Sequence, residues 1–424
     1  MVVGEDIKGI GLFDMINGEE DINELEKRLC DYNDDSLYDF FLSNIKEKFR
    51  FHVLSLPHTV TREDYCACAY TMKVLKFCKM MKKRGHYIIH YGHEDSVVDC
   101  DEHVTLITNK DMEKAYGDFD WKKNFFKHSL QDHCHITFNE KGKKEIKNRL
   151  KKKDFVLPFW GKGAYWIVED IKKDGRAIIV EPGIGYHNSW CDFRIYESYA
   201  VLHHTMGLQN SKKPSWYHCV VPNYFDIDNF EFSAEKEDYF LCLGRISKCK
   251  GVHIAIQATE KIGKKLVVAG QGDILVELGV SKLPEHVEYV GYADMDKRKK
   301  LLKNAKALIL LSDYVEPFGG TAVEAMISGT PVIVPDWGVF HETVMHGLTG
   351  YRCRTFEQIC WAAENCDKIN PNDCRNWAVK NYCCARVSLM YEEFFLQLYN
   401  LWEKGWYQEN KNRKELHWLD KIMP

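Results

Sequence analysis

Residues 306–335 read KALILLSDYVEPFGGTAVEAMISGTPVIVP. An apolar run comes first, a loop with two adjacent glycines and a helical pattern follow, and a second apolar run between two prolines closes the stretch. Short apolar runs bounded by Gly or Pro are typical of parallel strands that are buried on both faces. The stretch therefore predicts a strand–loop–helix–strand unit of a parallel sheet.

The same alternation extends on both sides of this unit, across the second half of the chain. Strands are predicted at 239–245, 264–272, 286–291, 306–312, 331–335 and 348–353. Helical patterns lie between them, and six strands that alternate with helices predict a doubly wound parallel sheet. Ligands of such sheets bind beyond the carboxyl ends of the strands, so a site is expected in the loops that follow them.

The first half contains the same kind of unit with a weaker pattern. An apolar strand at 51–57 is followed by a helical pattern that ends at Gly85 and by a second strand, YIIHYG. Strand, helix and strand joined by a right-handed crossover form an α/β unit. Further short apolar runs occur at 154–161 and 176–186. We therefore expect two α/β domains of similar size that face each other across a cleft.

The length of 424 residues is sufficient for two or three domains. The turn-forming residues around Pro222 mark the interdomain linker. The predicted division is an N-terminal helical extension at 1–48, an N-terminal Rossmann-like acceptor domain at 49–222, a C-terminal Rossmann-like domain at 223–387 and a C-terminal helix at 388–424.

Composition excludes several classes of protein. The 58 basic and 62 acidic residues give a net charge of -4, whereas proteins that wrap duplex nucleic acid usually carry a basic excess. No apolar run approaches the ~20 residues that a membrane span needs, and the acidic N-terminus is unlike a signal peptide. The 16 scattered cysteines are typical of reduced thiols. We expect a cytoplasmic protein without a metal site.

The loop after the strand at 239–245 has the character of an anion site. Arg245, Lys248 and Lys250 precede a helix that begins after Gly251. Backbone N–H groups at a helix N-terminus, together with two cationic side chains, are suited to a diphosphate. The alternative is a solvated basic turn in front of a helix.

The loop after the strand at 306–312 carries two carboxylates. Glu316 precedes Gly319 and Gly320, Thr321 begins the helix, and Glu324 is placed in its first turn. Carboxylates on both sides of a glycine-containing helix start suit a polyhydroxylated ligand, because each accepts hydrogen bonds from two hydroxyls. The helix dipole alone would favour Glu324, but it leaves Glu316 and the two glycines unexplained.

Six motifs in a fixed order carry a resemblance to a known family. They are LGRISKCKG, VVAGQGD, VEYVGY, EPFGGTAVEAM, GTPVIVPDWGVFHETV and HGLTGY. Residues 217–355 thereby resemble the nucleotide-sugar-binding domain of GT-B glycosyltransferases, in particular glycosyltransferase family 4. The resemblance implies a GT-B fold, with two Rossmann-like domains facing a central cleft. It also implies that the C-terminal helix crosses back onto the first domain.

The resemblance assigns roles to residues of the second half. Arg245 and Lys250 would hold the donor diphosphate. Glu316 would contact the hydroxyls of the donor sugar, and Glu324 would hold the ribose diol. The remaining donor-binding positions that it implies are Gly270, Tyr289, Gly291, Phe318, Gly319, Gly320 and Thr321.

The first half departs from the family pattern. Residues 57–61, PHTVT, stand where members carry a glycine-rich loop. Many members have a histidine near the donor sugar, at a place where this chain has Glu181, with His187 six residues further on. His187 is therefore the candidate for this catalytic position. Glu181, His58 and Thr59 remain candidates on the acceptor side.

The function that these features imply is retaining transfer of a sugar from a nucleotide-diphosphate sugar to an acceptor hydroxyl of a glycan, glycoprotein or lipid. Neither a cofactor nor a metal is required. The alternatives are a sugar phosphorylase, a nucleotide-sugar epimerase and a non-catalytic nucleotide-sugar-binding protein. The basic segment 141–154 would contact a membrane surface, or else form a solvated face. Nucleic acid is not expected as a partner.

Overall fold

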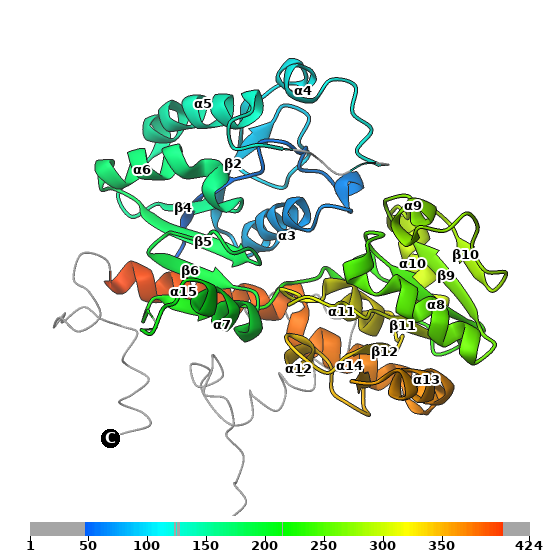
Figure 1. The fold of residues 1–424 in the computed structure, drawn as a ribbon. Helices are drawn as coiled ribbons and strands as arrows, with labels where there is room; N and C mark the ends of the chain where they lie inside the picture. Colours follow the sequence, from blue (N-terminus) through cyan, green and yellow to red (C-terminus); the bar gives the residue numbers. More distant parts are fainter. Residues whose placement is uncertain (1–46, 123, 125–127, 214, 402–424) are drawn as a thin grey trace, which may run out of the picture.

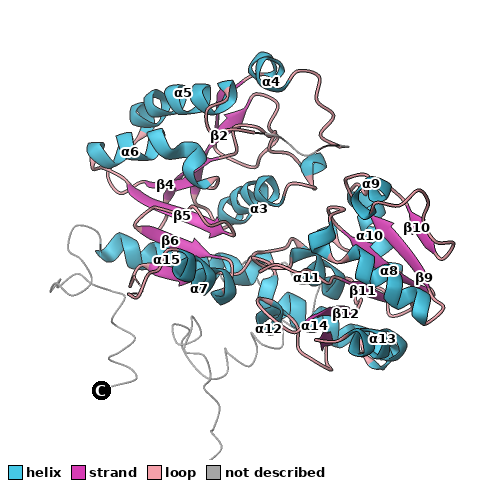
Figure 2. Ribbon diagram, viewed as in Figure 1, coloured by secondary structure: helices cyan, strands magenta, loops and turns pink. Residues whose placement is uncertain are grey.

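The structure is a computed structural model that describes residues 47–122, 124, 128–213 and 215–401. The expected extension at 1–48 lies outside these residues except for its last two positions, and the tail beyond 401 also lies outside them. Two parallel sheets with helices packed against them form two domains (Figures 1 and 2). The predicted fold class, α/β with two Rossmann-like sheets, is confirmed.

The C-terminal sheet has six strands in the order β10-β9-β8-β11-β12-β13, all parallel. Its strands are β8 (Tyr239–Leu243), β9 (Lys265–Ala269), β10 (Val287–Tyr289), β11 (Ala307–Ile309), β12 (Val332–Pro335) and β13 (Gly350–Cys353). Each lies within one of the six predicted strands. The order reverses between β8 and β11, which is the position where ligands bind in sheets of this kind.

The N-terminal sheet has seven parallel strands in the order β3-β2-β1-β4-β5-β6-β7. They are β1 (Arg50–Leu54), β2 (Tyr87–His93), β3 (Glu102–Ile107), β4 (Phe155–Pro158), β5 (Ile178–Ile184), β6 (Phe193–Tyr196) and β7 (His218–Val220). The patterns at 51–57, 154–161 and 176–186 correspond to β1, β4 and β5. The short strand β7 ends just before Pro222, so the sheet continues almost to the predicted linker.

Helices connect the strands in both domains. In the N-terminal domain they are α3 (Ala69–Lys83), α4 (Asn109–Tyr116), α5 (His133–Arg149), α6 (Tyr165–Asp174) and α7 (Tyr199–Leu208). In the C-terminal domain they are α8 (Val252–Lys261), α9 (Ile274–Leu278), α10 (Met295–Asn304), α11 (Gly320–Ile327), α12 (Phe340–Thr343), α13 (Phe356–Asn365) and α14 (Pro371–Tyr382). The last described helix is α15 (Cys384–Leu401).

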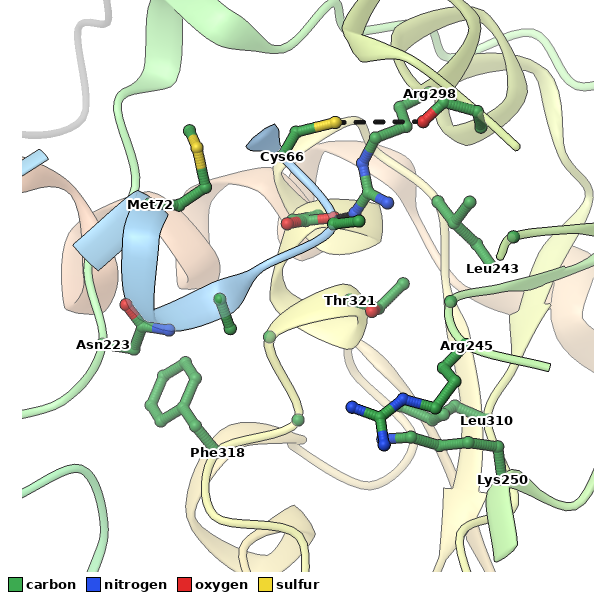
Figure 3. Close-up of a pocket in the computed structure, with 18 of the residues that line it drawn as sticks. Cys66, Met72, Asn223, Leu243, Arg245, Lys250, Arg298, Leu310, Phe318 and Thr321 are labelled. Atoms are coloured by element: carbon green, nitrogen blue, oxygen red, sulfur yellow. Dashed lines mark hydrogen bonds and ion pairs between the residues drawn. The ribbon is translucent and has the colours of Figure 1, made fainter. Parts of the chain in front are cut away.

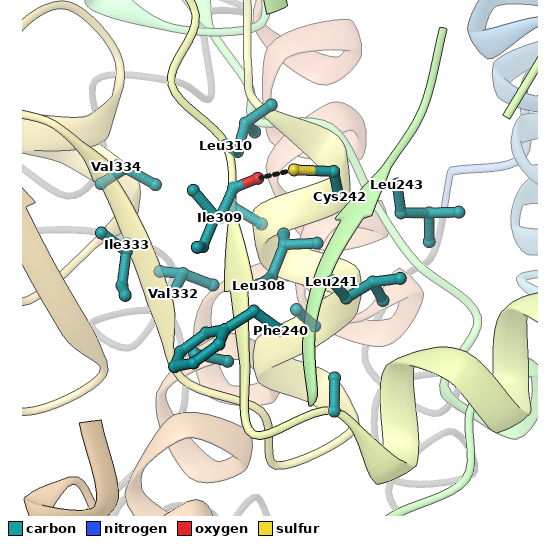
Figure 4. Close-up of a cluster of buried hydrophobic side chains, with 14 of the residues drawn as sticks. Phe240, Leu241, Cys242, Leu243, Leu308, Ile309, Leu310, Val332, Ile333 and Val334 are labelled. Atoms are coloured by element: carbon teal, nitrogen blue, oxygen red, sulfur yellow. Dashed lines mark hydrogen bonds between the residues drawn. The ribbon is translucent and has the colours of Figure 1, made fainter. Parts of the chain in front are cut away.

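The core of the C-terminal domain lies along its central strands. Figure 4 shows Phe240, Leu241, Leu308, Val332 and Ile333 among the apolar side chains that meet there. All five are at most 1% exposed. Burial on both faces of a parallel sheet explains why these strands read as continuous apolar runs. The rigid sheet fixes the positions from which the site loops begin.

Helix α15 belongs to the C-terminal end of the chain but packs on the N-terminal domain (Figure 1). Its side chains Val387, Tyr391 and Phe395 are fully buried in one cluster with Phe51 and Phe77. The Glu392 carboxylate also pairs with His86 Nε2 at 2.7 Å and with Arg84 Nε at 2.5 Å. The helix therefore attaches the C-terminal part of the described chain to the N-terminal domain through a buried apolar surface and a buried ion pair.

The two crossings between the domains lie side by side. The Phe225 N–H donates to Tyr382 O at 2.9 Å, and the Cys384 N–H donates to Phe225 O at 2.9 Å. Phe225 and Cys383 form an isolated parallel bridge. The outgoing and returning segments are thus paired by backbone hydrogen bonds at the point where the chain passes between the sheets.

Candidate functional site

A cavity of about 600 Å³ lies between the two domains. Its C-terminal wall comes from the loops after β8, β9 and β11 and from α10 and α11, and its N-terminal wall from α3 and the residue after β6 (Figure 3). The carboxyl ends of parallel strands therefore face this space, as the fold requires. In addition to Arg245 and Lys250, seven of the predicted donor-binding positions line the cavity: Gly270, Glu316, Phe318, Gly319, Gly320, Thr321 and Glu324.

Arg245 and Lys250 reach the cavity from the loop after β8 (Figure 3). The Lys250 ammonium forms an ion pair with Glu316 and lies 2.5 Å from the Tyr314 hydroxyl. Gly251 ends the short turn that carries Lys250 and caps the N-terminus of α8. Two cationic side chains and a helix start on one wall are suited to an anionic ligand.

Gly251 is required by the close approach of this loop to the segment that follows β11. Its φ is +71°, and a Cβ at this position would lie 2.1 Å from Leu311 O. Gly263 has a similar φ of +64° with nothing within 4 Å of its Cβ position. Gly251 therefore combines a left-handed backbone with a steric limit, whereas Gly263 has only the former.

We expect Gly251→Ala to lower the free energy of unfolding by about 2–5 kcal/mol, because backbone strain and overpacking act together. Gly263→Ala is the matched control and should cost only about 1–2 kcal/mol. Urea unfolding monitored by circular dichroism measures both. Equal losses in the two variants would contradict the steric role of Gly251.

Glu316 is held in place before any ligand arrives. Its side chain is nearly buried, and Oε1 accepts a hydrogen bond from the Ser312 hydroxyl at 2.6 Å as well as the Lys250 ion pair. Both partners come from the loops at the carboxyl ends of the central strands β8 and β11. A carboxylate fixed in this way presents its remaining acceptor capacity in one direction.

Glu324 differs from its predicted place in the helix. Helix α11 begins at Gly320, and no acidic residue lies in its first turn. Glu324 is therefore in the second turn, where the helix dipole no longer accounts for it. Its carboxylate instead forms an ion pair with Arg298, which lies on α10 and also lines the cavity.

Tyr289 and Gly291 do not line the cavity, although Tyr292 does. The Tyr289 hydroxyl donates to Gly270 O at 3.0 Å and to Gly272 O at 2.7 Å. It thus secures the loop after β9, of which Gly270 and Gln271 line the cavity. Tyr289, implied by the resemblance as a donor-binding position, therefore contacts the neighbouring loop in this structure.

The candidates from the N-terminal half do not reach the cavity. His187 is exposed, and its ring packs edge-on against His204 with centroids 4.9 Å apart. Glu181 is buried and accepts hydrogen bonds from the Tyr186 hydroxyl and from the Trp190 and Cys191 N–H groups. Burial raises the pKa of the Glu181 carboxyl above its usual value, and the three hydrogen-bond donors offset only part of this effect. Glu181 therefore closes the loop after β5 and is not presented to a ligand.

His58 and Thr59 are also buried outside the cavity. The His58 ring stacks on His128 with centroids 4.3 Å apart, and the Thr59 hydroxyl bonds to that of Thr71 at 2.7 Å. The loop at 57–61 is thus packed into the domain. None of residues 57–61 lines the cavity, although Thr59 contacts α3 from behind its cavity-lining face.

Sequence reasoning missed the polar residues of the N-terminal wall. Tyr70, Lys73 and Lys76 line the cavity from α3, and Glu197 lines it directly after β6. Lys73 and Lys76 are three positions apart on a helix whose buried face is otherwise mainly apolar, which is the one sequence signal that could have singled them out. Arg298 was missed because a basic residue on α10 reads as a surface residue.

The domains touch beside the cavity. The Ser198 hydroxyl donates to Pro317 O at 2.7 Å. The Tyr199 and Ala200 N–H groups, at the start of α7, donate to the Glu342 carboxylate at 2.9 and 2.8 Å. The first contact connects the loop that carries Glu316 to the end of β6, and the other two connect α12 to the start of α7.

Metal-ligating clusters and membrane-spanning helices are both absent from the described part of the chain. No group of three or more His, Cys, Asp or Glu side chains in the described residues is arranged to hold a metal ion. Among the helices that the structure describes, none combines the length and the apolar character that crossing a membrane requires.

Comparisons with known proteins agree with this geometry. Residues 224–369 match the family described as glycosyl transferases group 1. An uncharacterized glycosyltransferase, MJ1607, of Methanocaldococcus jannaschii is 36% identical over 155 residues, which are 32% of this chain and 39% of that protein. The O-antigen chain mannosyltransferase RfbU of Salmonella typhimurium is 30% identical over 172 residues, which are 38% of this chain and 43% of that protein. The chain thus spans about two fifths of the length of these curated relatives.

Solved structures match over more of the chain. The sucrose-phosphate synthase of Thermosynechococcus elongatus superposes with a TM-score of 0.64 at 15% identity, covering 83% of this chain and 99% of that one. Alr3699/HepE of Anabaena, solved with UDP-glucose, gives a TM-score of 0.58 at 14% identity, covering 81% of this chain and 98% of that one.

The fold is therefore GT-B, with two Rossmann-like domains and a cavity between them. Residues 224–369, which make up most of its C-terminal domain, match the family model described as glycosyl transferases group 1.

Proposed function

We propose that this chain is a retaining glycosyltransferase that moves a sugar from a nucleotide-diphosphate sugar to an acceptor hydroxyl. One observation carries the proposal. Arg245 and Lys250 follow β8, Glu316 and Glu324 lie in the loop after β11 and in helix α11, and all four line the same cavity at the carboxyl ends of the strands. The first two are cations and the last two are carboxylates, which is the combination that a diphosphate joined to sugars requires.

The chemistry follows from charge. When the bond between the sugar and the diphosphate breaks, negative charge develops on the leaving group. Arg245, Lys250 and the N-terminus of α8 stabilise this charge, and preorganised cations of this kind lower a barrier by several kcal/mol. They supply the electrostatic stabilisation that a metal ion supplies elsewhere, so we propose that the reaction needs no metal and no cofactor.

The carboxylates orient the donor. Glu316, fixed by Ser312 and Lys250, accepts hydrogen bonds from hydroxyls of the donor sugar. Glu324, fixed by Arg298, accepts hydrogen bonds from the ribose diol. The acceptor hydroxyl attacks from the face that the diphosphate leaves, so that the configuration at the anomeric carbon is retained. No carboxylate acts as a nucleophile in this scheme.

The acceptor is a carbohydrate or glycoconjugate that the N-terminal domain holds. We also propose that the protein is cytoplasmic and contacts a membrane surface peripherally through residues 141–154. Lys143 lies over the Trp166 ring at 5.9 Å, a cationic and aromatic pair of the kind found at membrane interfaces. In contrast, Lys147 pairs with Asp170 at 2.6 Å, which reduces the charge available to a lipid surface.

A ligand panel tests the function. We expect one nucleoside diphosphate among UDP, GDP and ADP to raise the melting temperature, because a ligand at 100 times its dissociation constant adds about 2.7 kcal/mol to stability. The corresponding nucleotide sugar should be hydrolysed slowly in EDTA, with release of a sugar of unchanged anomeric configuration. Anomer-resolved NMR measures the product.

The panel also separates the alternatives. Turnover that depends on inorganic phosphate would indicate a phosphorylase, and a changed nucleotide sugar would indicate an epimerase. Binding without any turnover would indicate a non-catalytic protein. Absence of binding to every nucleotide would contradict the proposal, and activity that is lost in EDTA and restored by a divalent ion would contradict its metal independence.

A further inference from the structure

The N-terminal wall of the cavity contains a buried ion pair that the proposed mechanism does not use. Lys73 of α3 pairs with Glu197, the residue after β6, and both line the cavity. Their side chains are only 3% and 4% exposed. Lys73 and Glu197 are 124 positions apart in the chain, so the pair depends on the folded domain.

Stability alone does not explain this pair. Removing two charges from water is costly, and replacing a buried ion pair by apolar side chains of similar size is often neutral or stabilising. Burial lowers the pKa of the Lys73 ammonium, and the Glu197 carboxylate counteracts this effect. A buried charge pair in a cavity wall is a feature that functional sites share.

The pair has capacity left for a ligand. Lys73 donates to Glu197 Oε1 and to Gly183 O at 3.0 Å, and its ammonium lies 4.1 Å from the centroid of the Tyr70 ring. An ammonium has three protons, and two of them have acceptors among the described residues. Glu197 is engaged through Oε1, and no hydrogen bond to its Oε2 occurs within the described part of the chain.

The pair faces the loop that carries Glu316. A Cβ placed on Gly185 would lie 2.6 Å from Glu197 Oε1 and 2.8 Å from Pro317 Cβ, so Glu197 and Pro317 approach the same point from opposite domains. The neighbouring Ser198 hydroxyl donates to Pro317 O at 2.7 Å. Glu197 of the N-terminal domain and Pro317, the residue after Glu316, thus lie close to each other where the two domains meet.

We propose that Lys73 and Glu197 hold the transferred sugar from the N-terminal side, opposite Glu316, and so determine which sugar is accepted. Glu197 Oε2 accepts a hydrogen bond from one sugar hydroxyl, and the third Lys73 proton is donated to another. In this proposal the pair takes the place near the donor sugar for which the sequence predicts His187. This inference rests on the proposed function, because it requires a nucleotide sugar in the cavity.

The test compares affinities for a nucleotide with and without its sugar. Calorimetry with UDP and UDP-glucose, with GDP and GDP-mannose, and with ADP and ADP-glucose first identifies the nucleotide and nucleotide sugar that bind the unmodified chain. In Glu197→Gln and in the neutral double variant Lys73→Gln/Glu197→Gln, the dissociation constant of the nucleoside diphosphate should change less than twofold. That of the nucleotide sugar should rise tenfold or more, as expected on loss of hydrogen bonds to charged groups.

Glu392→Gln is the matched control. Glu392 is an equally buried carboxylate of an ion pair, but it lies on α15 and does not line the cavity. Neither affinity should change in this variant. The double variant keeps the wall neutral, so it remains informative where the single variant fails to fold.

Two outcomes overturn the inference in distinguishable ways. Unchanged affinity for the nucleotide sugar in a folded Glu197 variant, with or without loss of transfer, would show that the pair does not contact the sugar. Failure of the unmodified chain to bind any of the six probes would contradict the proposed function itself.

Discussion

Replacement of Arg245 by Ala is expected to lower turnover by about two to three orders of magnitude, the range found when one preorganised donor to a developing anion is removed. Arg245 lines the cavity, and its side chain extends from the loop after β8. Lys250→Ala should have at least the same effect, because Lys250 also pairs with Glu316. Its removal therefore takes away a contact that orients this carboxylate as well as a cation beside the diphosphate.

Nucleotide-sugar hydrolysis and calorimetric binding of the nucleoside diphosphate measure this effect. Lys248→Ala is the matched control, because Lys248 lies in the same turn but does not line the cavity. It should retain normal turnover and binding. Unchanged kinetics in a folded Arg245→Ala protein would overturn the assignment of the diphosphate to this loop.

Deletion of α15 is expected to unfold the N-terminal domain. A chain that ends at Cys383 lacks Val387, Tyr391 and Phe395, which are fully buried against the first sheet, together with the buried Phe394 and Leu398. Burying one such side chain stabilises by about 1.5–3 kcal/mol, so the loss from this surface is on the order of 10 kcal/mol. That amount is comparable to the whole stability of a typical domain.

Urea unfolding and limited proteolysis of the two domains measure the outcome. A chain that ends at Leu401 is the control, because it keeps every described contact of α15. It should match the full chain in its unfolding midpoint. If the chain that ends at Cys383 unfolds at the same urea concentration as the control, α15 is not part of the N-terminal core.

The sequence predicts the C-terminal domain well, and the reason is physical. A strand buried on both faces needs an unbroken apolar run, so β8 and β12 are visible in the sequence itself. The loops that follow parallel strands must carry the ligand contacts, so the sequence alone is sufficient to place Arg245 and Glu316 on one wall. Their roles toward a ligand remain predictions.

The N-terminal wall cannot be predicted in the same way. Strand β6 has only four residues, two of them half-buried, so its pattern is weak and Glu197 at its end does not stand out. Lys73 reads as a surface residue of an amphipathic helix, and only its partner 124 positions away explains its burial. The sequence favours His187 because it follows β5, but the turn that Glu181 holds together carries it to the surface.

The paired crossings at Phe225 and Cys384 have a consequence for motion. A single linker would allow the two domains to twist, slide and separate, whereas two hydrogen-bonded segments side by side resist stretching and shear. Rotation about the line of the pairing is the motion that these two hydrogen bonds resist least. A molecule that touches both Glu197 and Glu316 would therefore favour one value of this rotation over the others.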